Sequence, residues 1–361
     1  MNAERLHRIV IELKKEYDLN TILEKLRAVR DNLQNQVSQP QQPLFQQNLV
    51  AALKDLSETL SKSETNNFSP SWMELINEIG GENLFGNELK TKIEEIFATN
   101  QITPAAALLE LTEIVTKSEA FKLSVDNLSS AYKSLNIGAE NLEDGECELG
   151  YTIPRLYVKN ELKSLSKEVA ELNFILTTLS EAVDGEKTEF EVRTISSSEF
   201  LFVVSIGIYL AKVISEVVEK IIDNYKKILE IKKLRNELKA AGVADKDTKG
   251  IEQHANNSME KEISLLTNEI ITNSSLKDTA RKNELKNGVT IALNKIANRI
   301  DCGFNIEIRV KDLAESKEEE TGNAEILEMI NIIKSNAKIM EFIKSDGQPI
   351  LQLTESEKKS N

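Results

Sequence analysis

Residues 162–183 read LKSLSKEVAELNFILTTLSEAV, and their apolar side chains recur at the spacing of a long packed helix. Seven consecutive a and d heptad positions are apolar, at Leu162, Leu165, Val169, Leu172, Leu176, Leu179 and Val183. Such a seam is typical of a helix that packs along its length against another helix. A second seam follows at Ile214, Val217, Ile221, Asn224, Ile228, Ile231, Arg235 and Leu238. We therefore predict a bundle of long, coiled-coil-like helices, whose seams pack within the chain or against a second copy.

Short segments with a period of two interrupt this helical region. Glu189 to Ile195 and Phe304 to Val310 alternate apolar and polar residues, as half-buried strands do. Tyr151 to Ile153 and Ile350 to Leu353 are further candidates, because two strands alone are only marginally stable. We expect these segments to form a small, mostly antiparallel β-sheet at one end of the bundle.

The N-terminal region carries shorter helical patterns that are separated by turns. The segment Ser38 to Asn48 has two prolines, five glutamines and no charged residue, so we expect a turn or short linker there. Gly80-Gly81 and Thr103-Pro104 mark further breaks, the second with proline at the first helical position. This region is predicted to be a compact, acidic bundle of short helices.

The composition changes between Asn136 and Gly150, where glycines and acidic residues occur without a basic one. We place the domain boundary in this segment. The predicted organisation is an acidic helical domain at 1–140, a long-helix bundle with the sheet at 151–353, and a charged, disordered tail at 354–361. The predicted fold class is mainly α, an acidic bundle of short helices followed by a long-helix bundle with a small, mostly antiparallel β-sheet.

The charge of the chain argues against two classes of partner. The formal net charge is −14, so the chain repels phosphate backbones and anionic lipid, and neither nucleic acid nor a membrane surface is expected as a partner. Residues 31–150 hold 7 Lys or Arg against 19 Asp or Glu. We therefore expect a basic protein partner to bind the acidic N-terminal domain, in an association that salt weakens.

The most apolar stretch, Phe200 to Ala211 (FLFVVSIGIYLA), is predicted to be a helix buried at the centre of the C-terminal bundle. As a helix its 12 residues span about 18 Å, short of the roughly 30 Å hydrocarbon core. Extension to Val218 adds Lys212 and Glu216, so constitutive membrane insertion is not expected. The alternative function is a conditionally membrane-active effector, of toxin or defence type, that exposes residues 200–218.

Few residues suited to chemistry occur in the sequence. His7 and His254 are the only histidines, neither belongs to a metal-binding pair, and both are expected to be partly exposed on helices. Cys147 and Cys302 are expected to be separate free thiols, as in a reducing compartment, although both flank predicted strands.

Two segments resemble catalytic or binding motifs only superficially. Gly80 to Gly86 (GGENLFG) lacks the preceding strand and the Gly-Lys-Ser/Thr ending of a phosphate loop, so we interpret its glycines as turn and helix-start residues. Ser196 to Glu199 (SSSE) matches a helix capping box and has no histidine nearby. No catalytic, cofactor-binding or metal-binding residue is predicted, and no cofactor is expected.

The densest basic cluster lies on the second long helix. Except for Arg235 it falls outside the heptad seam, so we expect a solvated helix flank rather than an anion-binding face. The cluster consists of Lys226, Lys227, Lys232, Lys233, Arg235 and Lys239.

These patterns favour a non-enzymatic, cytoplasmic interaction or scaffold protein that acts through helical surfaces. Long heptad helices joined by short strands resemble scaffold subunits of bacterial systems, in architecture over residues 151–345 and without a shared motif. We expect a homodimer, because flanking apolar positions such as Leu229 and Leu234 need to be covered. A small-molecule site or enzyme in the N-terminal half is a further alternative for which the sequence offers no residues.

Overall fold

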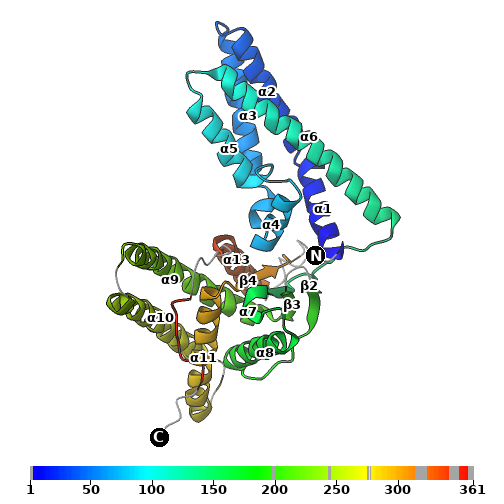
Figure 1. The fold of residues 1–361 in the computed structure, drawn as a ribbon. Coiled ribbons are helices and arrows are strands. Elements are labelled where there is room, and N and C mark those ends of the chain that lie inside the picture. Colours follow the sequence, from blue (N-terminus) through cyan, green and yellow to red (C-terminus); the bar gives the residue numbers. More distant parts are fainter. Residues whose placement is uncertain are drawn as a thin grey trace. The chain divides into compact units, whose positions relative to one another are not determined.

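The structure, a computed structural model, describes residues 3–196, 200–242, 245–274, 276, 278–313, 323–340 and 349–356. Within them the chain is mainly α-helical with one small antiparallel sheet, which confirms the predicted fold class (Figure 1). The chain divides into two compact units, unit 1 at Met1–Asn141 and unit 2 at Leu142–Asn361. The division falls inside the glycine-rich acidic segment at 136–150.

Unit 1 is entirely helical in the residues described. Its helices are α1 (Ala3–Asp18), α2 (Ile22–Ser38), α3 (Pro43–Ser61), the 3-10 helix η1 (Glu64–Asn67), α4 (Pro70–Glu78), α5 (Gly86–Thr99) and α6 (Pro104–Ser134). Proline begins α3, α4 and α6, where its missing N–H has no intrahelical partner to lose. α2 packs against α3 and α6, and α5 packs on α3. With 31 residues, α6 is far longer than the short helices expected here.

The sheet belongs to unit 2. Its strands are β1 (Cys147–Ile153), β2 (Val192–Ser196), β3 (Phe200–Ile206) and β4 (Asn305–Val310), in the order β2-β3-β1-β4. Every neighbouring pair is antiparallel. The strands predicted at 189–195, 304–310 and 151–153 are therefore present, with shifted ends, whereas Ile350–Leu353 is extended without joining the sheet.

The prediction of a helix over Phe200 to Ala211 is wrong, because β3 fills its first part and a helix starts only at Ile208. β3 is an inner strand between β2 and β1. Phe202 and Val203 point to opposite faces of the sheet, and both are buried. A strand buried on both faces is apolar all round, so periodicity cannot distinguish it from a buried helix. Among the described residues, no helix combines the length and apolarity needed to cross a bilayer.

Unit 2 surrounds the apolar face of this sheet with helices. They are α7 (Arg155–Val158), α8 (Leu162–Asp184), α9 (Ile208–Ala240), α10 (Asp245–Asn273), α11 (Thr279–Asp301) and α13 (Asn323–Ile339). α8 packs mainly along α11, whereas α9 packs on α10 and α13. Gly185, at a φ of 85°, ends α8 in the left-handed conformation that glycine adopts without strain.

Only part of the first heptad seam is buried. Leu172, Leu176 and Leu179 are buried in the core of unit 2, whereas Leu162 at the start of α8 is 83% exposed. The main neighbour of α8 is α11 rather than α9, so the two predicted seams do not form one continuous pair. Of the apolar positions predicted to need a second copy, Leu229 packs against the core and Leu234 is exposed.

Candidate functional site

A short C-terminal segment, residues 349–356, lies in extended conformation against α10 and α11. Ile350, Leu351 and Leu353 are buried and belong to the core of unit 2. Gln352 and Thr354, which alternate with them, are exposed. From Leu351 to Thr354 the residues alternate between buried and exposed, as in a strand, but the backbone of the segment is held by side chains of the two helices. We call this surface the α10–α11 groove.

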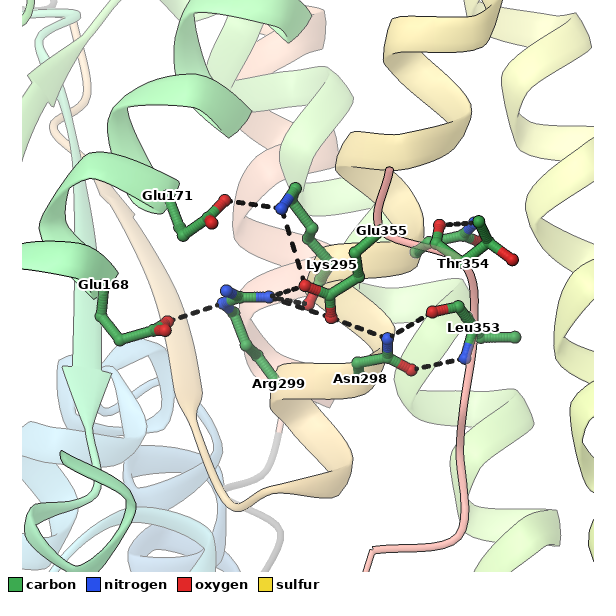
Figure 2. A network of polar contacts seen from close by, with 9 residues as sticks. Glu168, Glu171, Lys295, Asn298, Arg299, Leu353, Thr354 and Glu355 are labelled. Atoms are coloured by element: carbon green, nitrogen blue, oxygen red, sulfur yellow. Dashed lines mark hydrogen bonds and ion pairs between the residues drawn. The ribbon is translucent and has the colours of Figure 1, made fainter. Parts of the chain in front are cut away.

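Two asparagines bind the backbone of the segment in a bidentate manner. Asn298 on α11 donates from Nδ2 to the carbonyl of Leu353 at 3.0 Å and accepts from the Leu353 N–H at 3.1 Å (Figure 2). Asn256 on α10 donates to the carbonyl of Ile350 at 3.4 Å and accepts from the N–H of Gln352 at 2.8 Å. An amide group offers both a donor and an acceptor, as a neighbouring strand would. The two asparagines therefore bind the segment through its backbone N–H and C=O groups rather than through its side chains.

The α11 residues that hold the segment share one helix face. Asn294, Asn298 and Asp301 stand at i, i+4 and i+7, a spacing that aligns side chains along a helix. Asn294 adds a 2.8 Å hydrogen bond from Nδ2 to the carbonyl of Thr354. The register of α11 is set at its start, where the Asp278 side chain caps the helix by accepting from backbone N–H groups.

Asp301 joins three parts of unit 2. Its Oδ2 accepts from the backbone N–H groups of Ile350 and Leu351 at 2.5 and 2.7 Å. Its Oδ1 accepts from the Tyr225 hydroxyl at 2.5 Å and lies 3.5 Å from Lys232 Nζ. Asp301 and Lys232 are both buried, so this ion pair lies away from solvent. The prediction that Lys232 belongs to a solvated flank is therefore wrong, because the buried face of α9 includes it.

The rest of the basic cluster is divided between surface and interior. Lys227 is exposed and pairs with Asp223 on the same helix, and Lys233 is exposed. Arg235 is buried, as its seam position suggests. The side chain of Lys239 lies outside the described residues. The cluster does not form one continuous basic face.

The end of the segment enters a cluster of charges on α8 and α11. Glu355 accepts from Asn298 Nδ2 at 2.7 Å and lies 3.3 Å from an Arg299 guanidinium nitrogen and 3.6 Å from Lys295 Nζ. Arg299 also pairs with Glu168 at 2.9 Å, and Lys295 with Glu171 at 2.6 Å (Figure 2). Thr354 and Glu355, assigned above to a disordered tail, are held in this structure, and only residues 357–361 of that tail lie outside the described ranges.

Electrostatics favour an ionised carboxylate at Glu355. Burial by itself raises the pKa of Glu355, but the hydrogen bond from Asn298 and the positive charge of Arg299 outweigh it and hold the pKa below its ordinary value. The two α11 cations face two carboxylates of α8 as well as Glu355. The site thus stabilises the ionised carboxylate of Glu355, two residues after the buried Leu353.

A second concavity between α8 and α11 has a volume of about 880 Å³ and is open. Amides and hydroxyls such as Asn173 and Thr177 line it, and its Glu181 and Arg281 pair with each other. Among the described residues, no three His, Cys, Asp or Glu side chains are arranged to hold a metal ion.

The histidines and cysteines are not among the residues described above that hold the C-terminal segment. His254 is exposed on α10, as expected. His7 is buried and stacks on Tyr132 with the ring centres 4.6 Å apart, so the expectation of partial exposure is wrong for this residue. Cys147 and Cys302 are free thiols, and burial raises their pKa values to about 12 and about 11.

The two motif-like segments have structural roles where they are described. Gly80 to Gly86 forms the turn between α4 and α5, and a Cβ at Gly81 would lie 2.6 Å from Ile76. The N–H of Asn87 donates to Asn66 Oδ1 at the start of α5. Ser196 ends β2, residues 197–199 lie outside the described ranges, and the next element is β3, so the helix implied by the capping box is absent.

The α10–α11 groove was not among the sites predicted from the sequence. One signal was present, namely the polar stripe Asn294, Asn298 and Asp301 at helical spacing on a helix rich in apolar residues. A second was the apolar triplet Ile350, Leu351 and Leu353 beside a charged terminus, since such residues need a place to be buried.

Comparison with known proteins adds no relative. No family model matches the chain, and neither a curated protein nor a solved structure matches it.

Proposed function

We propose that the protein is a non-enzymatic, cytoplasmic interaction or scaffold protein, and that the α10–α11 groove is a binding surface for extended peptide segments. The observation that carries this proposal is the bidentate binding of Leu353 by Asn298, repeated at Ile350 and Gln352 by Asn256. Helices that bind main-chain groups in this way accept a peptide by its extended conformation, much as a sheet edge does.

The contacts define the peptide that would fit. Positions 350, 351 and 353 require apolar side chains because they are buried, whereas positions 352 and 354 are exposed and accept any residue that tolerates extended backbone. Position 355 favours an acidic side chain, which Asn298, Arg299 and Lys295 bind. The chain's own segment satisfies this pattern and acts as an intramolecular ligand.

A peptide-binding experiment tests the proposal. In the full-length chain, Ile350→Asp with Leu353→Asp should release the internal segment, because neither carboxylate tolerates the buried positions. A fluorescent peptide with the sequence of residues 349–356 should then bind, with higher anisotropy than it shows with the unsubstituted chain. The same peptide carrying Asp in place of Leu353 is the matched control.

The groove itself is tested by Asn298→Ala in the released background. Loss of its hydrogen bonds to the peptide, each contributing roughly 0.5–1.5 kcal/mol, should weaken binding by about tenfold or more. Circular dichroism should show that both variants remain folded. A folded, released variant that ignores the peptide would contradict the proposed function.

The membrane-active alternative finds less support in unit 2. It requires residues 200–218 to leave the protein, but removal of β3 would separate β2 from β1 and open the centre of the sheet. The interaction proposal requires no such disruption.

A basic protein partner for unit 1 is the second part of the proposal. Glu88 and Glu94 are exposed on α5, and residues 1–141 hold 14 Lys or Arg against 20 Asp or Glu. Binding of a basic partner should weaken with salt and with Glu88→Lys combined with Glu94→Lys. The same reversal at Glu260, exposed on α10, should leave the affinity unchanged.

A further inference from the structure

A long surface without charge lies at one end of unit 1. Residues 32–53 contain no Asp, Glu, Lys or Arg, although 29% of the chain is charged. They form the end of α2, the connection and the first half of α3. Only Leu33 and Leu49 of these 22 residues are buried, whereas 14 are exposed and 6 are partly exposed. We call this surface the uncharged tip.

The uncharged tip is exposed because its neighbours stop short of it. α5 packs on the second half of α3, and the α2–α3 hairpin continues past the ends of α5 and α6 (Figure 1). Val50 remains 61% exposed on this free part of α3. Three residues later the helix reaches a groove of about 260 Å³, which has an apolar floor. The floor consists of Leu53, Leu56, Leu60, Ile93 and Phe97.

Part of the uncharged tip, Val50 and the groove lie on one side of α3. Gln46, Val50, Leu53 and Ser57 follow the three- and four-residue spacing of a helix face. Leu53 and Ser57 line the groove between α3 and α5, so the face continues from Val50 into it. Depletion of charged residues around an apolar centre is the composition of a protein interface core.

The net charge indicates which partner fits this face. In a two-fold interface each residue meets the same surface of the other copy, so charged groups close to the axis face groups of the same sign. Two copies that each carry a net charge of −14 repel each other wherever acidic residues dominate. A surface of 22 successive uncharged residues avoids this repulsion.

We propose that the uncharged tip is the surface through which two copies of this chain associate, with α3 antiparallel to α3 of the second copy and the two-fold axis near Val50. In this arrangement Val50 meets Val50 of the second copy, and the first turn of each α3 covers the groove at Leu53 to Ser57 of the other. Lys54, the first charged residue after the tip, lies opposite Gln46 of the second copy, so no like charges meet there.

The available area sets the expected strength. Interfaces of standard size use roughly 20–30 residues on each side. Only part of the 14 exposed and 6 partly exposed residues of the tip lies on the face around Val50, so the interface falls below this range. The dimer should therefore form reversibly as the concentration of the chain rises, independently of the α10–α11 groove.

Sedimentation equilibrium of the full-length chain tests the proposal. The mass should rise with concentration from 40.5 kDa towards twice that value. Raising the salt concentration should maintain or tighten the association, since salt screens the repulsion between the acidic bodies and the interface is centred on uncharged residues. A mass that stays at 40.5 kDa up to several hundred micromolar would overturn the proposal.

Val50→Asp locates the interface. Two aspartates facing each other across the axis should weaken the dimer by at least about tenfold. Leu109→Asp on α6, where the leucine is 70% exposed in the same unit, is the matched control and should leave the dimer intact. Because both positions are exposed, both variants should keep the helix content of the original chain.

A charge-swap experiment separates this interface from any other. Val50→Asp and Val50→Lys chains should each be largely monomeric alone but should associate when mixed, because unlike charges then meet across the axis. A dimer that survives Val50→Asp, or a mixture that stays monomeric, would show that association uses another surface.

Discussion

The hydroxyl of Tyr225 on α9 donates a 2.5 Å hydrogen bond to the carboxylate of Asp301 at the end of α11. Both side chains are fully buried. The same carboxylate accepts the backbone N–H groups of Ile350 and Leu351, so one acidic group fixes the position of α9, α11 and the C-terminal segment together. A buried carboxylate is tolerated only where donors replace its water shell, and this arrangement supplies them.

Replacement of Asp301 by asparagine should therefore destabilise unit 2. The amide nitrogen is a donor, so at least one of the donors at this position is left facing another donor, and the ion pair between Lys232 and Asp301 is lost. We expect a loss of about 3–5 kcal/mol in the free energy of unfolding, measured with urea. Asp223→Asn on exposed α9 surface should cost about 1 kcal/mol or less. Equal effects of the two substitutions would contradict this role.

The Glu168–Arg299 pair should behave as a coupled unit. Arg299→Met leaves the buried carboxylate of Glu168 without its partner and should cost about 3–5 kcal/mol. Glu168→Leu combined with Arg299→Met should recover part of this loss, since a leucine at position 168 needs no countercharge, whereas Glu355 still lacks Arg299. A double-mutant cycle measures the coupling. Simple additivity of the two single substitutions would show that the pair is not coupled.

The sequence predicts a strand correctly where one face of the strand is polar. It does not predict a strand that is buried on both faces. Residues 304–310 alternate because Ile306 and Ile308 face the core while Asn305 and Arg309 face the other side of the sheet. β3 shows no such alternation, because Val203 on its second face is buried as well. A fully apolar run contains no period, and its secondary structure depends on neighbouring strands that are distant in sequence.

The α10–α11 groove could be predicted only in part, from the polar stripe on α11. Asn298 binds main-chain atoms of Leu353, and main-chain atoms leave no signature in a sequence.

The burial of Lys232 was not predicted, because the heptad pattern assigns only its a and d positions to the buried face. α9 is buried over a broader face, which includes the position of Lys232. Uncharged residues at 32–53 were visible in the sequence, but their exposure became apparent only from where α5 ends.

Both cysteines should react slowly in the folded chain. Burial raises the pKa of Cys147 to about 12, with the charge of Glu146 adding to the effect, and raises that of Cys302 to about 11. The thiolate is the reactive form, so little of it is present at pH 8. Iodoacetamide should label neither residue quickly in buffer and both in denaturant, as mass spectrometry would show. Rapid labelling of Cys147 in the native chain would indicate that β1 opens readily.

Binding of the C-terminal segment in the α10–α11 groove should weaken at acidic pH. The pKa of Glu355 in the folded chain lies below its ordinary value of 4.5, so ionised Glu355 stabilises the docked segment above pH 4.5, and this contribution is lost as the pH falls through the folded-state pKa. Amide protection of Leu353, corrected for the intrinsic exchange rate at each pH, should therefore decrease below pH 4.5. Glu355→Gln should lower the protection at neutral pH and remove most of its dependence on pH in this window. Protection that stays constant in the original chain down to pH 3 would show that the buried leucine and the asparagines hold the segment without help from the charge.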